Sequence, residues 1–212
     1  MKRLLLSAAI FCSIAVNAQS DKFNDAMKKT LAMMDGAKST AEFIAASAAF
    51  ERIGDAEKTQ WLPYYYAGLS LVLPAWSDAN IDKDANAEKI KSFCSKAEAA
   101  ATDNTAKSEI ETLRNMAATQ QMMVDPQTRW QTNGMEAGTA LQKGMALDAT
   151  NPRIYYLQGM SMFGTPEQFG GGKDKAKPLF QKAIDLFKAT QSKPLYPSWG
   201  KEQAEAQLAL CN

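Results

Sequence analysis

The chain has 212 residues, of which 46% are hydrophobic and 22% charged; it carries a formal net charge of +1 and contains no histidine. This composition predicts one folded domain with a sizeable core. It excludes the strongly basic surface typical of nucleic-acid-binding proteins and of polybasic membrane patches. The absence of histidine removes the commonest general base and metal ligand in proteins.

Residues 1–18 have the pattern of a secretory signal peptide. A basic start, an apolar run over residues 4–16 and the small residues Val16-Asn17-Ala18 occur in the order that such peptides show. The run is too short to span a bilayer as a permanent anchor. We therefore expect cleavage after Ala18 and a periplasmic or secreted mature protein over residues 19–212, rather than a buried first helix.

The rest of the chain has a helical composition. It is rich in alanine, lysine, glutamate, glutamine and methionine, and no run of alternating β-branched residues indicates a strand. Residues 21–35 form the first predicted helix. Ser39 begins a second, with Glu42 three residues later completing a capping box. The pattern predicts a single domain of four helix pairs and a terminal cap, at residues 21–53, 61–102, 104–148, 152–190 and 192–212.

The segment from Asn151 to Leu186 contains two amphipathic stretches joined by a glycine-rich turn. If Pro152 is taken as the first position, the eighth position is occupied by a small residue, Gly159. The second stretch places Ala176, Phe180 and Ala183 at the spacing A-x3-F-x2-A. The segment resembles a tetratricopeptide repeat, a helix-turn-helix unit of 34 residues with these features, although its loop is longer than the family pattern.

The same register recurs elsewhere in the chain. When a 34-residue frame is counted forward from Ile53, Gly68 falls at the eighth position of the next unit. Counting forward from Gly144 places Gly159 at the eighth position of the unit that follows. The resemblance implies an all-α fold: a right-handed stack of about four antiparallel helix pairs, a tetratricopeptide-like solenoid, with a C-terminal capping helix.

No residue pattern predicts catalysis, a metal site or a cofactor. Gly170-Gly171-Gly172-Lys173 lacks the Ser or Thr that a phosphate loop requires, because Asp174 follows the lysine. These glycines instead predict a sharp turn with Phe169 packed against them. The serines and cysteines have no histidine partner, so we expect a protein that is not an enzyme. Cys94 and Cys211 are expected to be isolated thiols, with a disulfide as the alternative.

Without a catalytic site, we expect the protein to act by binding a partner through its surface. In tetratricopeptide arrays the first helix of each pair lines a concave groove that commonly holds a segment of another protein. The resemblance implies a non-catalytic adaptor or assembly factor of the bacterial envelope, whose partner is another envelope or secreted protein. Carried over by register, the groove residues are Leu62, Tyr65, Leu69, Arg153, Tyr156, Met160 and Phe163.

Two alternatives to an open protein-binding groove follow from the same residues. The first helix of the protein or the connector over residues 192–199 could fill the groove, which would make its lining part of the core. A small-ligand carrier is the other alternative, in which the paired tyrosines Tyr64, Tyr65, Tyr155 and Tyr156 line a closed cavity between helix pairs. The sequence does not specify the partner, the pathway or the oligomeric state.

Overall fold

The computed structural model of the protein describes residues 21–191 and 193–211, so the predicted signal peptide lies outside the described residues. Within these ranges the chain forms helices and turns and no strand. In the same part of the chain, no helix has the length and apolar character needed to cross a membrane.

The helices follow one another in antiparallel pairs, which confirms the predicted fold class. An N-terminal helix over residues 21–35 comes first. The later elements are α2 (Thr40–Glu57), α3 (Trp61–Ala75), α4 (Lys83–Ala100), α5 (Asn104–Met122), the short α6 (Pro126–Arg129) with a π-helical turn (Trp130–Gly134), α7 (Met135–Leu147), α8 (Pro152–Gly164), a 3-10 turn (Glu167–Phe169), α9 (Lys173–Ala189) and α10 (Lys201–Leu210).

Side-chain caps fix where the helices begin. The predicted capping box is present before α2: the Glu42 N–H donates to Ser39 Oγ, and the Ser39 N–H donates to Glu42 Oε2 at 2.9 Å. Asp82, Asp103 and Asn151 cap α4, α5 and α8 in the same way, by accepting hydrogen bonds from free backbone N–H groups of the first turn. Each such cap stabilises its helix by about 1 kcal/mol.

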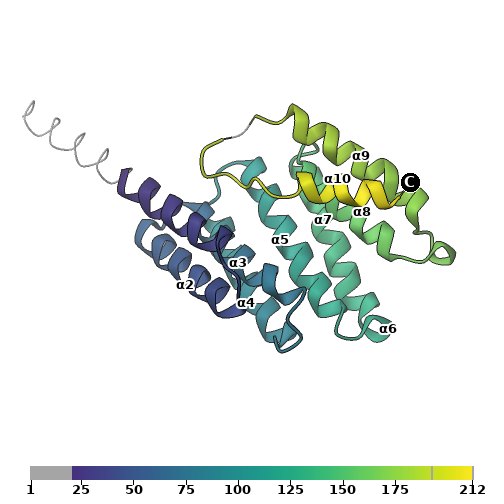
Figure 1. Ribbon diagram of the computed structural model, residues 1–212, viewed down its shortest axis with the longest axis horizontal. Coiled ribbons are helices and arrows are strands. Elements are labelled where there is room, and N and C mark those ends of the chain that lie inside the picture. The colour runs from purple at the N-terminus through teal and green to yellow at the C-terminus, as the bar shows by residue number, and fades with distance from the viewer. Residues whose placement is uncertain (1–20, 192, 212) are drawn as a thin grey trace, which may run out of the picture.

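The pairs stand side by side in a row that runs from the N-terminal helix to α9, with α5 near its centre (Figure 1). Helix α3 packs against α2, α4 and α5, while α5 also packs against α7 and α8. The last helix, α10, packs against α9.

The glycines predicted from the repeat register lie where helices approach closely. A Cβ atom on Gly68 would lie 3.2 Å from Leu113 Cδ1, and a Cβ atom on Gly159 would lie 2.5 Å from Phe180 Cε1. A methyl group at Gly159 would collide with the Phe180 ring, whereas at Gly68 the Leu113 side chain would have to shift by a few tenths of an ångström. The register therefore located two packing contacts of the core.

Other details differ from the sequence predictions. Helix α2 continues to Glu57 rather than ending near Ile53, and the C-cap residue Lys58 turns the chain with a positive φ of 43°. The prediction for Phe169 is wrong, because its side chain is 73% exposed. The turn is held by the backbone instead: the Gly172 N–H donates to Met162 O at 2.8 Å.

Cys94 and Cys211 are both free thiols. Cys94 is buried between α4 and α5, and burial raises the pKa of its thiol to about 12. We expect a disulfide reagent at pH 8 to modify Cys211 in the native protein and Cys94 only after denaturation, because the thiolate is the reactive form. Mass spectrometry of the labelled peptides checks this. Rapid native labelling of Cys94 would contradict its burial.

Replacing Gly159 with alanine should lower the free energy of unfolding by about 1–3 kcal/mol, because the added methyl group collides with the Phe180 ring. Gly138, on α7, is a matched control, since a Cβ atom there meets nothing within 4 Å. Gly138→Ala should leave stability unchanged or raise it by up to about 1 kcal/mol through helix propensity. Urea unfolding of both variants provides the comparison, and equal midpoints would refute the close approach at Gly159.

Candidate functional site

Helices α3, α5 and α8 run alongside one another and form what we call the inner face. Near their N-terminal ends, Arg153 of α8 donates from Nη1 to Glu109 Oε1 of α5 at 2.9 Å, and Glu109 also interacts with Tyr65 of α3. Further along, Gln120 Nε2 of α5 donates to the backbone carbonyl of Val72 in α3 at 2.9 Å. The three helices therefore have a common register along their length.

The Arg153–Glu109 ion pair is buried, with its side chains 7% and 6% exposed. Burial raises the pKa of Glu109, and the adjacent Arg153 guanidinium partly opposes this. The guanidinium also lies over the rings of Phe187 and Trp199, at 5.4 and 5.2 Å from their centroids. Removing two charges from water costs on the order of several kcal/mol each, so this pair depends on all of these contacts.

The connector between α9 and α10 covers this end of the inner face. Tyr66 Oη donates to the Leu195 carbonyl at 2.8 Å, and Trp199 Nε1 donates to Tyr65 Oη at 2.8 Å. The Tyr196 ring packs edge-on against Trp61, with centroids 5.6 Å apart. Residues of the C-terminal segment thus occupy the surface that the repeat register assigns to a partner protein.

The predicted groove residues consequently divide into two groups. Leu62, Tyr65, Leu69 and Arg153 are buried, so this part of the groove is filled by the protein itself and is not an open surface. Tyr156 is partly buried, with its ring near those of Phe180 and Trp199. Met160 and Phe163 retain exposure on α8, and a role for them in binding a protein stays a prediction.

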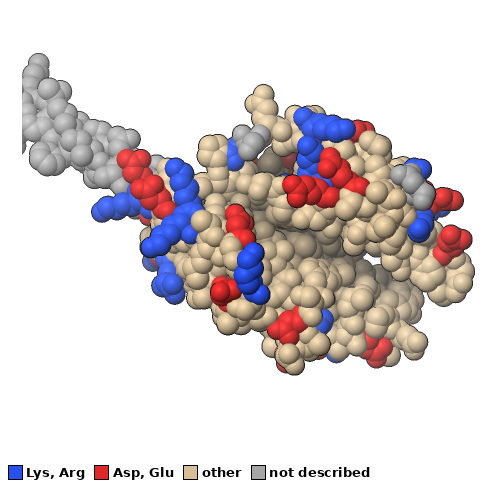
Figure 2. Space-filling model, in the orientation of Figure 1, with Lys and Arg blue, Asp and Glu red and all other residues tan. Residues whose placement is uncertain are grey.

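The C-terminal ends of the three helices retain exposed apolar side chains. Leu73, Trp76, Met123 and Met160, at the C-terminal ends of the three helices, are 36 to 54% exposed; we call them the open end of the inner face. Figure 2 shows the molecule hollowed below α10, and most of the hollow is formed by residues without charge. Arg129, which donates to the Gln121 carbonyl near this end, is already paired with Asp84 at 2.7 Å.

The four tyrosines do not line a common cavity. Tyr64 donates from Oη to Asp55 Oδ1 at 2.9 Å and contacts Gly54 of α2, whereas Tyr65 faces Trp199. Tyr155 donates to the Ala149 carbonyl at the start of α8.

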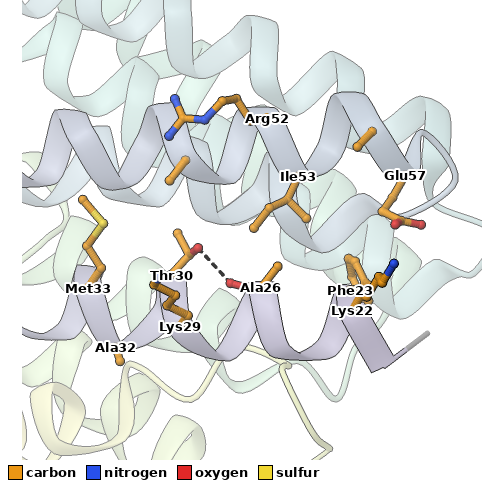
Figure 3. Close-up of a pocket in the computed structure, with 12 residues that line it drawn as sticks. Lys22, Phe23, Ala26, Lys29, Thr30, Ala32, Met33, Arg52, Ile53 and Glu57 are labelled. Atoms are coloured by element: carbon orange, nitrogen blue, oxygen red, sulfur yellow. Dashed lines mark hydrogen bonds between the residues drawn. The ribbon is translucent and has the colours of Figure 1, made fainter. Parts of the chain in front are cut away.

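A groove lies between the N-terminal helix and α2; we call it the N-terminal groove (Figure 3). Its volume is about 820 Å³, within the range of pockets for small molecules and cofactors. Phe23 and Ala26 line it from the N-terminal helix, and Ile53 lines it from α2. Thr30, whose hydroxyl donates to the Ala26 carbonyl at 2.8 Å, presents no free donor to the groove.

Basic side chains surround this apolar groove. Lys22 and Lys29 come from the N-terminal helix, Arg52 comes from α2, and Glu57 is the acidic residue on the rim. Within the described chain, Lys22, Lys29 and Arg52 form no ion pair, unlike Lys91, Lys96 and Lys143. Figure 2 shows Lys and Arg gathered over the N-terminal part of the described chain, at the left. Sequence reasoning missed this groove because the repeat register draws attention to the inner face alone.

The described residues contain no group of three or more His, Cys, Asp or Glu side chains placed to hold a metal ion.

The chain has no match among family models or curated proteins. It does match a solved structure, the HusA haemophore from Porphyromonas gingivalis, with a TM-score of 0.80. The two sequences are 37% identical over 89% of this chain and 92% of that one.

The chain belongs to the HusA haemophore family. At this identity and coverage, both the sequence and the arrangement of the helices are shared along nearly the whole protein. The HusA haemophore is a binding protein by its name, which favours the small-ligand alternative over the adaptor. The resemblance to tetratricopeptide repeats stays a prediction from register.

Replacing Arg153 with methionine should lower the free energy of unfolding by about 3–5 kcal/mol, because Glu109 is left buried without its counter-charge. The loss should be smaller at pH 5 than at pH 8. Without the guanidinium the folded state holds the Glu109 proton more tightly than the unfolded chain, so stability rises as pH falls.

The double variant Arg153→Met with Glu109→Leu is the control, since replacing a buried pair by apolar residues is often neutral. Urea unfolding at both pH values should show recovery of most of the loss. A double variant as unstable as the single one would mean that lost packing, and not the stranded carboxyl, causes the effect.

Proposed function

We propose that this protein is a non-catalytic carrier of haem that works outside the cytoplasm. The observation that carries the proposal is its relationship to the HusA haemophore, at 37% identity over 92% of that chain. The predicted signal peptide over residues 1–18 supports the location, although it lies outside the described residues. The open apolar surfaces described above support binding of a large apolar molecule.

Haem is a flat apolar ring with two carboxylates on one edge and an iron at its centre. Histidine, a frequent haem ligand, is absent from the chain, so any protein ligand to the iron must be another residue such as tyrosine, methionine or cysteine. Apolar contact with the ring and charge pairing with the carboxylates must then supply much of the affinity. A suitable site combines an apolar wall with unpaired cations.

The adaptor hypothesis has less support. Four of the seven residues assigned to its groove are buried, which leaves Tyr156, Met160 and Phe163 as the part that retains exposure. An envelope or secreted partner for that surface is still a proposal. It is compatible with haem carriage, because a carrier must also deliver its cargo.

The proposal predicts saturable binding of haem by the mature protein, residues 19–212. Titration should give a shifted Soret band that saturates at a fixed stoichiometry. Haem at 100 times its dissociation constant should also stabilise the fold by about 2.7 kcal/mol, because a ligand of the native state shifts the unfolding equilibrium. For a chain of this size that corresponds to a rise in melting temperature of roughly 5–10 °C.

As a control, the same titration on protein unfolded in urea measures non-specific association of haem. Absorbance that grows without saturation, or a melting temperature that does not change with haem, would reject haem carriage. Capture of a single envelope protein by a photoreactive residue at Met160, without any haem binding, would favour the adaptor instead.

A further inference from the structure

We propose that one edge of the helix row is a docking surface for a basic, amphipathic segment of another protein. This surface, which we call the apolar edge, consists of the turns that follow α3 and α5 and exposes Trp76, Met123, Val124 and Trp130 among acidic side chains. The inference concerns a protein partner and not the cargo, so it goes beyond the proposed function and does not depend on it.

The first argument is the distribution of exposed apolar residues. In the part of the chain that the structure describes, eleven large apolar side chains are exposed, and Leu210 of α10 is one of them. The other ten lie in, or within five residues of, a turn that joins the two helices of a pair: Met33, Ile44, Leu73, Trp76, Met123, Val124, Trp130, Met135, Met160 and Phe169. Single exposed apolar residues are normal on a protein surface, but gathered ones indicate an interaction site.

Contacts between turns make this edge continuous. Thr40 Oγ1, at the start of α2, donates to Asp78 Oδ2 of the α3–α4 turn at 2.5 Å. Asp84, at the start of α4, pairs with Arg129 Nη1 of α6 at 2.7 Å. The turns within the first three pairs are therefore bound to one another, and their exposed side chains form one surface.

A small hollow lies between the two turns of the apolar edge. It has a volume of about 390 Å³ and is lined by Ile81 from the α3–α4 turn and by Met123 and Val124 from the end of α5. A hollow of this size can receive apolar side chains of a docked helix. Trp76 and Trp130 are 49% and 55% exposed nearby in sequence, and tryptophan and methionine are enriched at protein interfaces.

The second argument is the charge of the apolar edge. Within the described chain, Asp78, Asp82 and Asp125 form no ion pair, whereas Lys83 is the one cation of these two turns that is likewise without an ion pair. Hydrogen bonds from Thr40 and Thr128 lower the pKa of Asp78 and of Asp125, so both carboxyls are ionised at neutral pH. The edge thus combines apolar side chains with an excess of negative charge.

This combination specifies the chemistry of the partner. A second copy docked through the same edge would bring carboxylates against carboxylates, which is unfavourable. Anionic lipid headgroups would be repelled in the same way, and zwitterionic headgroups carry no net positive charge. A protein segment with lysine or arginine beside apolar residues complements both features at once.

The test uses a short amphipathic peptide of leucine and lysine as the probe, with fluorescence anisotropy of the labelled peptide as the readout. The charge variant is Asp82→Asn with Asp125→Asn, because asparagine caps a helix as well as aspartate does. At low salt we expect its dissociation constant to be about three- to tenfold higher than that of the wild type, as for exposed ion pairs. High salt should remove most of this difference by screening.

The matched control is Asp103→Asn with Asp148→Asn, which makes the same change of charge at the opposite edge, where Asp103 caps α5. It should bind the peptide like the wild type. A third variant, Met123→Ser with Trp130→Ser, removes exposed apolar surface and should weaken binding about tenfold or more at every ionic strength. These side chains are exposed, so folding should change little; if one edge variant fails to fold, the other still decides.

Four results would overturn the proposal. They are equal affinity for a leucine–glutamate peptide, peptide binding that neither edge variant weakens, an equal loss in the opposite-edge control, and no saturable peptide binding by the wild type. Co-sedimentation with phosphatidylcholine vesicles that Met123→Ser with Trp130→Ser abolishes would assign the edge to lipid instead. Dimerisation lost in that variant, measured by sedimentation velocity, would assign it to a second copy. None of these readouts involves haem, so their failure leaves haem carriage standing.

Discussion

The buried ion pair between Arg153 and Glu109 is the interaction on which the arrangement of the stack depends. One guanidinium contacts a carboxylate on α5, the Pro197 carbonyl of the connector and the rings of Phe187 and Trp199. A buried charge is tolerated only where its partners are fixed. The pair therefore specifies how α5, α8, α9 and the connector meet, rather than merely adding stability.

The connector explains why the inner face serves this protein differently from a repeat array with an open groove. A row of few helix pairs has a short inner surface rich in aromatic residues, and Tyr196 and Trp199 cover much of it. The surface that remains for a ligand lies at the open end and between the first two helices.

Much of the fold could be predicted from local sequence. The capping box at Ser39 follows from short-range chemistry, and the close-packed glycines Gly68 and Gly159 follow from the 34-residue register. The filling of the inner face could not be decided in this way, because Tyr66 and Leu195 are 129 residues apart in sequence. The N-terminal groove was missed for a related reason: an apolar face that stays partly uncovered has the same residue pattern as one that is buried.

The link between Tyr65 on α3 and Trp199 at the end of the connector spans 134 residues, and it gives the protein a property that open solenoids lack. In an array where each unit touches only its neighbours, the ends can melt while the middle persists. Here a late segment is bonded to an early pair, so loss of either removes contacts from both. Such long-range closure makes unfolding more nearly all-or-none and slows the search for the native state, since the chain must close a large loop before those contacts form.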